Sequence, residues 1–384
     1  MIRKKKICFV LVNRANYGRV RSLMLYLKNS KYFDLQTVLI SSTLLKKYGS
    51  LNKLIRKDRI KINYQLFNHI EGENLFTMTR STGLALLDLS SIFQKLNPDI
   101  VFTIGDRYET LSTAITASFL NKYLVHLQGG ELTGSIDEYV RHSVTKLSNL
   151  HLVSTKKSRK RVIQMGENPN RVFNVGCPSI DIIKKTNLNQ NINFKKYGNG
   201  VGYKIDYKKP YYVILLHPVT TKYKENLNLI MEMIKVVKKL DHQIVWLWPN
   251  NDAGSNMLTK KIRSLREKNK KLKINFFINF EVEDYLRLIN KCKCLIGNSS
   301  SGIRESSFLG IPVVNIGERQ KLRERGDNVI DSSVDSQKIL QSIKIITKKK
   351  IRKSKLYGDG NSNKKIINIL KKIDLSTKKI FYDL

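Results

Sequence analysis

The stretch NPDIVFTIGDRYETLSTAITASFLNKYLVHLQGGE, residues 97–131, decides the fold class. Its pattern predicts an apolar strand over Asp99–Ile104, a helix over Glu109–Leu120 and a second apolar strand over Tyr123–Leu127. Strands that are apolar along their whole length are typical of a parallel sheet covered by helices on both faces. Because strand–helix–strand crossovers are right-handed, the stretch predicts a doubly wound α/β domain.

The same alternation of strands and helices extends in both directions. It begins with a buried strand over Ile7–Val12, and after a polar segment at 187–209 it resumes with a strand over Tyr211–Leu216. The polar segment is rich in Asn, Lys and Gly, as linkers are. We therefore expect an α/β chain of two doubly wound, Rossmann-like domains, residues 1–186 and 187–361, facing a common cleft as in the GT-B architecture.

The composition narrows the classes of function. The 384 residues include 70 Lys plus Arg and 31 Asp plus Glu, which gives a net charge of +39. A charge of this size is typical of nucleic-acid binding. However, the lysines are scattered, and no Arg-rich arm, RNP motif or zinc-finger spacing accompanies them. We expect no nucleic-acid partner, and an attraction for small anions instead.

The chain carries no signal for a membrane or for an oxidising compartment. No apolar run reaches the 18 residues of a membrane-spanning helix, and the basic start before Ile7 lacks a small-residue cleavage pattern. The four cysteines have no CxxC spacing and fall in or next to apolar strands, which is typical of buried, reduced thiols. We expect a cytoplasmic protein without a membrane partner.

Polar residues follow several predicted strands, and ligands of doubly wound domains bind at the carboxyl ends of the strands. In the loop Asn13–Gly18, Arg14 lies beside a helix start, where an arginine suits a phosphate, although an ordinary surface arginine fits equally. After the next strand, Asp106 and Arg107 fit either a helix cap with a salt bridge or a base that a cation keeps ionised.

The loop Gln128–Glu131 and the helix predicted after it hold three acids and a histidine within twelve residues. The acids are Glu131, Asp137 and Glu138, the histidine is His142, and Ser135 is expected to cap the helix. This is more than capping requires. Carboxylates held close together can have separated pKa values, so that one acts as a base and another as an acid.

The second domain carries a different kind of loop. Gly297–Gly302, ahead of a helix predicted over Ile303–Leu309, combines small residues, three hydroxyls and a helix start. These features fit a diphosphate cradle, with Glu305 placed for ribose hydroxyls, or a loop that merely turns. His217 and the segment Pro249–Ser255 follow other strands of this domain. No GxGxxG, Walker or HExxH motif occurs, so we expect neither a dinucleotide cofactor nor a catalytic metal.

Together these motifs resemble those of the hydrolysing UDP-N-acetylglucosamine 2-epimerases, which include bacterial enzymes of sialic-acid synthesis and the epimerase half of the animal bifunctional epimerase/kinase. The matching motifs run along nearly the whole chain, at residues 13–17, 105–107, 128–131, 136–138, 141–142, 176–179, 217–221, 249–255, 297–300, 304–305, 317–320 and 356–361. The resemblance implies that UDP leaves C1 of the sugar as the C2 proton is lost, giving 2-acetamidoglucal. Water then adds, giving free N-acetylmannosamine for sialic-acid-type synthesis.

The resemblance also implies roles for individual residues. Its catalytic residues are Asp106, Glu131 and Asp137 for proton transfer, Glu138, which stands where relatives commonly carry Asp, and Arg107 and His142 as supports. Its UDP-binding residues are Arg14, His217, Ser299 and Ser300 for the diphosphate, Glu305 for the ribose, and Asn250, Asp252 and Arg319 on the nucleotide side. It further implies that residues 362–384 include a helix that packs back on the first domain, and that the protein is a homodimer or homotetramer.

Three alternatives stay open. The same reaction on UDP-2,4-diacetamido-2,4,6-trideoxyglucose, as in legionaminic-acid synthesis, shares nearly every motif, and the animal-like stretch His217–Thr221 favours the unmodified sugar over it. A non-hydrolysing UDP-N-acetylglucosamine 2-epimerase and a GT-B glycosyltransferase are the others. In each case the expected ligand is a UDP-sugar.

Overall fold

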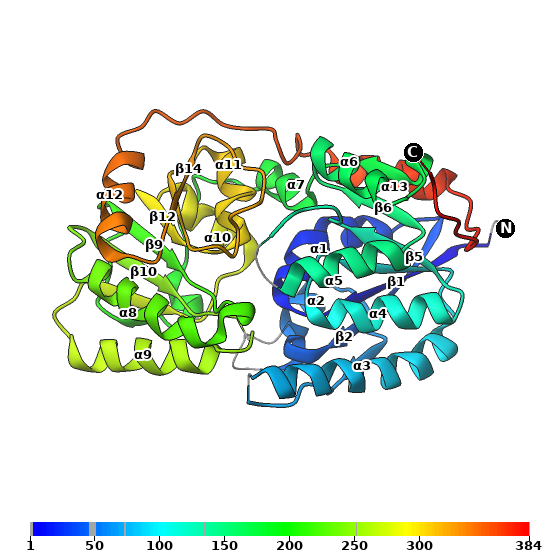
Figure 1. Ribbon diagram of the computed structural model, residues 1–384, viewed down its shortest axis with the longest axis horizontal. Coiled ribbons are helices and arrows are strands. Elements are labelled where there is room, and N and C mark those ends of the chain that lie inside the picture. The colour runs from blue at the N-terminus through cyan, green and yellow to red at the C-terminus, as the bar shows by residue number, and fades with distance from the viewer. Residues whose placement is uncertain (1–2, 46–50, 73, 134–135, 251, 384) are drawn as a thin grey trace.

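The computed structural model describes residues 3–45, 51–72, 74–133, 136–250 and 252–383, and it consists of two α/β lobes side by side (Figure 1). The two doubly wound domains expected from the sequence are confirmed. Ser135, the expected helix cap, lies outside the described residues. Within those residues, no helix has both the length and the apolar character needed to cross a membrane.

The first domain is built on a seven-stranded sheet in the order β3-β2-β1-β4-β5-β6-β7, in which all neighbouring strands are parallel. Its strands are β1 (Lys5–Leu11), β2 (Phe33–Ile40), β3 (Tyr64–Leu66), β4 (Ile100–Ile104), β5 (Tyr123–Leu127), β6 (Leu150–Val153) and β7 (Val172–Asn174). The strand order reverses between β1 and β4, and such a switch point opens a crevice at the carboxyl ends of the strands. The loops after β1 and β4 therefore border this crevice.

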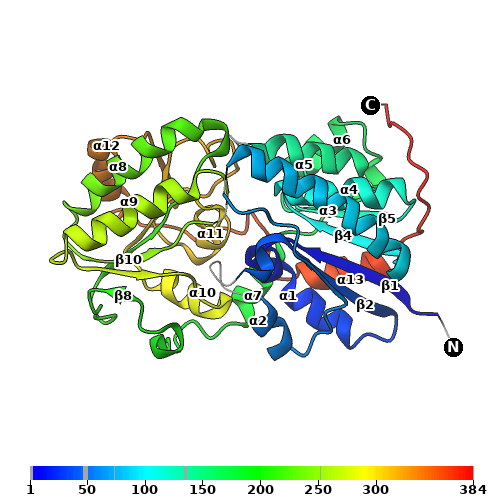
Figure 2. The ribbon, with the colours of Figure 1, turned by 90° about the horizontal axis from the view of Figure 1, so that it is seen from below.

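Helices cover both faces of the first sheet (Figures 1 and 2). They are α1 (Arg14–Lys28), α2 (Asn52–Lys57), α3 (Leu75–Leu96), α4 (Tyr108–Phe119), α5 (Ile136–Leu147), α6 (Lys156–Gln164) and α7 (Pro178–Lys185). Successive side chains of a strand point to opposite faces, and in β1 both sets are buried. Ile7 and Phe9 join the core cluster that contains α1 residues, whereas Cys8 and Val10 join the one with α3, α4 and α5 residues. This explains why the strand is continuously apolar.

The second domain repeats the plan with one difference. Its sheet has the order β14-β13-β12-β9-β10-β11-β8, and β8 is antiparallel to β11. The strands are β8 (Val201–Gly202), β9 (Tyr211–Leu215), β10 (Gln243–Leu247), β11 (Ile274–Phe277), β12 (Cys294–Gly297), β13 (Val313–Ile316) and β14 (Val329–Ser332). The helices are α8 (Asn226–Val237), α9 (Ser255–Lys268), α10 (Val282–Asn290), α11 (Glu305–Leu309) and α12 (Ser336–Ile346), and the last helix, α13 (Ser362–Lys372), packs on the first domain. The polar 187–209 segment thus supplies an edge strand as well as a connection.

Two helices tie the lobes together. Ile180 and Ile183 of α7 belong to a core cluster of the second domain, while α7 also contacts α1 of the first domain. After α12 the chain crosses back over the top of the molecule to α13 (Figure 1). There Ile366 and Leu370 share a core cluster with β1. The lobes are therefore held at one end, and the carboxyl edges of their sheets face a common gap.

Candidate active site

A cavity of about 330 Å³ lies between the domains. Its first-domain wall comes from the loop after β1, the loop after β4 and the first turn of α5, and its second-domain wall comes from the loops after β9, β10, β12 and β13. Most of the residues singled out from the sequence line it: Arg14, Asp106, Arg107, Asp137, His217, Asn250, Ser299, Ser300, Glu305 and Arg319. Loops far apart in the chain thus meet where strand ends converge, as the doubly wound fold predicts.

Asp106 is buried at the end of β4, after Gly105, whose φ of 75° lies in the left-handed region that favours glycine. Its carboxylate accepts hydrogen bonds from Arg141 of α5 and, at 2.9 Å, from Arg323 of the second domain. Burial favours the neutral acid, but the nearby guanidinium groups outweigh it and hold the pKa of Asp106 well below its usual range. This carboxylate therefore stays ionised at neutral pH.

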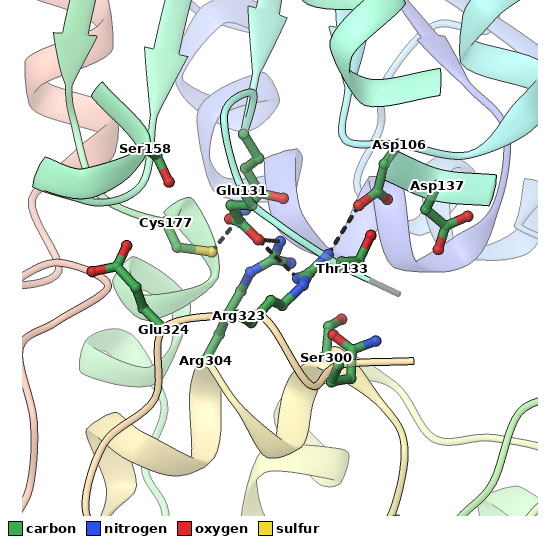
Figure 3. Close-up of polar contacts among 12 residues, drawn as sticks. Asp106, Glu131, Thr133, Asp137, Ser158, Cys177, Ser300, Arg304, Arg323 and Glu324 are labelled. Atoms are coloured by element: carbon green, nitrogen blue, oxygen red, sulfur yellow. Dashed lines mark hydrogen bonds and ion pairs between the residues drawn. The ribbon is translucent and has the colours of Figure 1, made fainter. Parts of the chain in front are cut away.

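Glu131 lies behind Asp106 and forms ion pairs with two arginines of the second domain (Figure 3). Its Oε2 atom is 2.6 Å from Nη2 of Arg304 and 2.9 Å from Nη1 of Arg323. Burial would raise the pKa of Glu131, but these cations, with Arg141, lower it to about 2. Glu131 is not among the described residues that line the cavity.

Asp137, in the first turn of α5, differs from the other two acids. Burial and the neighbouring Asp106 raise its pKa to about 6, against the opposing charge of Arg319, whose Nη2 is 3.6 Å away. Asp106 and Asp137 border the same space, one ionised and one that titrates near neutral pH. Two carboxyl groups whose environments separate their pKa values form a potential acid–base pair.

The remaining first-domain residues have structural partners. Arg107 forms ion pairs with Glu109, 2.9 Å away, and with Asp252 of the second domain. The cations that keep Asp106 ionised are Arg141, Arg323 and Arg19, and the adjacent Arg107 pairs with other acids. Glu138 accepts a hydrogen bond from the backbone N–H of Thr133, and its Oε1 lies 3.4 Å from Nε2 of His142.

Glu138 and His142 are not among the cavity-lining residues of the described chain, and neither is Asp252. Burial, together with the charge of Arg141, lowers the pKa of His142. Asp252 lies next to the lining residues, because it accepts a 2.6 Å hydrogen bond from Asn250 and lies 3.6 Å from Arg319. Because they do not line the cavity, Glu138, His142 and Asp252 are placed to support the residues that do, not to contact a ligand directly.

The facing wall is formed around the loop after β12. Gly297 has a φ of 147°, and a Cβ atom there would collide with the carbonyl oxygen of Leu215, so this turn requires glycine. Ser299 caps a 3₁₀ turn over Ser300–Gly302, and α11 begins only at Glu305. The helix expected from Ile303 is thus shorter and follows a tighter turn, which leaves the serine hydroxyls at the cavity.

His217, in the same wall, presents a hydrogen-bond donor to the cavity. Its Nδ1 accepts a hydrogen bond from the backbone N–H of Asn250 at 3.2 Å, and burial, reinforced by Arg319, lowers its pKa to about 3. A neutral imidazole whose Nδ1 accepts carries its proton on Nε2. Across the cavity, Arg14 donates to the carbonyl of Phe280 at 3.2 Å, and Arg19 donates to Ser300 at 3.5 Å.

Sequence reasoning missed Arg19 and Arg323, and it quoted Arg304 only as part of a motif. Arg19 and Arg323 line the cavity. Arg323 follows β13 in the loop that also holds Arg319, so the strand-end rule that selected the other loops applies to it as well. The rule could not identify the partners of Arg323, which are Asp106 and Glu131 of the other domain.

Comparisons with known proteins place the chain among nucleotide-sugar enzymes. The family model described as UDP-N-acetylglucosamine 2-epimerase matches residues 26–371. The chain is 33% identical to the UDP-N,N'-diacetylbacillosamine 2-epimerase (hydrolyzing) of Legionella pneumophila over 97% of both chains. It is 36% identical to the GDP/UDP-N,N'-diacetylbacillosamine 2-epimerase (hydrolyzing) of Campylobacter jejuni over 86% of this chain and 85% of that one.

A solved structure shares the fold. The UDP-GlcNAc 2-epimerase of Methanocaldococcus jannaschii, in complex with UDP-GlcNAc and UDP, superposes with a TM-score of 0.79 at 17% identity, covering 95% of this chain and 99% of that one. At this identity the likeness bears on the two-domain architecture alone.

Proposed function

The chain belongs to the UDP-N-acetylglucosamine 2-epimerase family, and from this membership we propose that it is a hydrolysing 2-epimerase of a UDP-linked 2-acetamido sugar. One observation carries the proposal. Asp106 and Asp137 line one cavity with different affinities for a proton, opposite a serine loop and a neutral histidine. Epimerisation with loss of UDP needs both parts, namely proton carriers of separated pKa and a holder for the departing diphosphate.

In the first step, a carboxylate removes the C2 proton and the C1–O bond to UDP breaks, so that the C2–H electron pair becomes the double bond of 2-acetamidoglucal. Proton transfer is most efficient for a group whose pKa is near the working pH. Asp137, with a pKa of about 6, meets this condition best. Asp106 borders the same space and is the second candidate carrier. Glu131 does not line the cavity, and it acts on Asp106 through Arg323, which contacts both acids.

The departing UDP is assigned to the facing wall. Arg14, His217 through its Nε2–H, and the hydroxyls of Ser299 and Ser300 surround the cavity where its diphosphate would lie. These donors stabilise the negative charge that grows on the leaving oxygen, and Glu305 is placed for the ribose. In the second step, water supplies a hydroxyl to C1 and a proton enters C2 from the opposite face. The sum consumes one water and releases UDP and the free sugar with inverted C2, which is N-acetylmannosamine when the substrate is UDP-N-acetylglucosamine.

Two substrates fit this reaction. UDP-N-acetylglucosamine is the first, with N-acetylmannosamine as a precursor for sialic-acid-type synthesis. The second is the 2,4-diacetamido-2,4,6-trideoxy nucleotide. The names of the Legionella and Campylobacter relatives favour it, at 33% and 36% identity.

An NMR experiment in D₂O tests the proposal. The protein is incubated separately with each nucleotide sugar, and products are followed by ¹H NMR. We expect free sugar with inverted C2, deuterium at C2, and UDP in equal amount. A UDP-linked epimer would identify the non-hydrolysing reaction, and turnover only when an acceptor sugar is added would identify a glycosyltransferase. The absence of reaction with both nucleotides would reject the proposal.

A further inference from the structure

Two arginines of the second domain extend across the boundary between the domains to acids of the first (Figure 3). Arg304 precedes α11, and Arg323 lies in the loop between β13 and β14. Their side chains are only 2% and 3% exposed, and the side chain of Glu131 is equally shielded from water, at 3%. Ion pairs that are removed from solvent depend strongly on both partners, because either charge left alone in such a place is costly.

Arg323 is the arginine that contacts both acids. Its Nη2 lies 2.9 Å from Oδ2 of Asp106, and its Nη1 lies 2.9 Å from Oε2 of Glu131. A guanidinium is planar and its nitrogens are fixed relative to one another, so one side chain can donate a hydrogen bond to Asp106 while its charge faces Glu131 as an ion pair. The single ammonium of a lysine lacks this geometry.

The two acids differ in what their own domain provides. Asp106 has Arg141 of α5 as a first-domain partner. The side chain of Glu131 forms its ion pairs, among the described residues, with Arg304 and Arg323 of the second domain. Arg141 donates to the backbone oxygen of Glu131 at 2.8 Å, which holds the loop and leaves the carboxylate to the other domain. The charge balance of Glu131 therefore depends on the two domains facing each other.

We propose that Arg323 is a positioning residue that bridges Asp106 and Glu131, so that the orientation of these two carboxylates depends on the second domain facing the first. The kinetic consequences rest on the proposed function, whereas the electrostatic ones do not. Arg323 itself lines the cavity, and its pKa, lowered to about 10 by burial and by Arg304, leaves it charged at neutral pH. Its charge is thus available at the site.

Other groups also face these acids. Around Glu131 they are Arg304, Arg141 and Tyr357, and around Asp106 they are Arg141, Arg19, Asp137 and His126. Removal of the Arg323 charge leaves one arginine ion pair on each acid, Arg141 on Asp106 and Arg304 on Glu131. The pKa of both acids should therefore rise, because an opposite charge has been lost while the burial remains.

The first test needs no substrate. Protein labelled with ¹³C at the Glu side-chain carboxyl is titrated by NMR, and the Glu131 signal is assigned from its absence in Glu131→Gln. In Arg323→Gln we expect the Glu131 midpoint to move up by about one pH unit, and in Arg323→Lys by less. The matched control is Arg21→Gln, which removes another ion pair between the domains, that of Arg21 with Glu283, together with the pair of Arg21 with Asp58, and contacts neither Asp106 nor Glu131. An unmoved midpoint in Arg323→Gln, or an equal shift in the control, would overturn the proposal.

The second test is kinetic. We expect Arg323→Gln to lower kcat roughly 100-fold, with KM and the Kd for UDP within about threefold of wild type, and Arg323→Lys to recover part of the loss. Thermal unfolding shows whether each variant is folded. Wild-type kcat in a folded Arg323→Gln variant would reject the positioning role. If the wild type itself converts none of the nucleotide sugars, the proposed function fails, and the NMR titration still decides the role of Arg323.

Discussion

The two walls of the cavity are built at the same edge of the same kind of sheet, yet they carry opposite chemistry. The first-domain wall and the shell behind it hold Asp106, Glu131 and Asp137. The second-domain wall holds neutral donors and acceptors, such as His217 and the serines after β12, together with the arginines that pair with the acids. Glu131 is balanced by arginines of the second domain, and Asp106 by Arg323 of the second domain together with Arg141 of its own. The fold supplies equivalent positions, and different kinds of residue occupy them on the two walls.

The first wall also contains a second contrast, among its acids. Arginines keep Asp106 and Glu131 ionised, whereas Asp137, with the weaker partner Arg319 at 3.6 Å and Asp106 nearby, has a pKa raised to about 6. Similar carboxyl groups in one site thus differ because of where their cations lie. Variants that affect one wall and spare the other test whether this division is functional.

The largest effect is expected on the first wall. Asp106→Asn and Glu131→Gln keep the shape of each side chain and remove its charge, so we expect kcat to fall by about 10²- to 10⁴-fold while UDP still binds. Steady-state kinetics and calorimetric titration with UDP measure the two quantities. Glu131→Gln leaves Arg304 and Arg323 with less compensation in a buried place, so its unfolding must be checked too. Near-normal kcat in both variants would remove these acids from the chemistry.

The sequence predicts those features of the two walls that depend on residues close together in the chain. Apolar strands, the helices between them and the polar residues that follow each strand are properties of neighbouring residues. They led to the two domains and to most of the cavity lining, including Asp106, Asp137 and His217. The family, expected from the ordered motifs, is confirmed by the match over residues 26–371.

The sequence could not supply the pairing between the walls. Arg323 is 217 residues from Asp106, and Arg304 is 173 residues from Glu131. No periodicity or spacing relates such positions, because the contact depends on how two separately built domains face each other. For the same reason the sequence suggested Arg107 as the cation for Asp106, whereas Arg107 pairs with Glu109 and, across the gap, with Asp252.

A smaller effect is expected for Asp137, on the pH dependence of the free energy of unfolding. Burial raises its pKa from 3.8 to about 6, so the folded protein binds this proton more tightly than the unfolded chain does. The stability contributed by neutral Asp137 is therefore fully present below about pH 4 and is lost as the pH rises to about 6, by up to about 3 kcal/mol in total. Asp137→Asn should reduce this loss, so that the variant unfolds at higher urea than wild type at pH 8.

Urea unfolding at pH 5 and pH 8 measures the part of this loss that falls above pH 5, about 1.4 kcal/mol for a pKa of about 6. Asp88→Asn, at an exposed position of α3, serves as the control, with the pH dependence of wild type. If Asp137→Asn loses stability between pH 5 and pH 8 as steeply as wild type does, the acid is ionised in the folded protein without penalty, and the contrast between the acids fails.

The smallest effect is expected on the second wall, where binding should weaken and chemistry should persist. Glu305, in the first turn of α11, lines the cavity and is assigned to the ribose. Glu305→Gln keeps an acceptor oxygen but loses the charge that strengthens its hydrogen bonds, so we expect UDP affinity to fall about tenfold, or about 1.4 kcal/mol. KM should rise in parallel, with kcat within a factor of about two, as for an interaction made equally in ground and transition states.

Glu267→Gln, exposed on α9, is the matched control for the loss of one negative charge from a strongly basic protein. A drop in kcat as large as that of Asp106→Asn, at unchanged UDP affinity, would show that the second wall takes part in proton transfer and that the two walls do not divide the work.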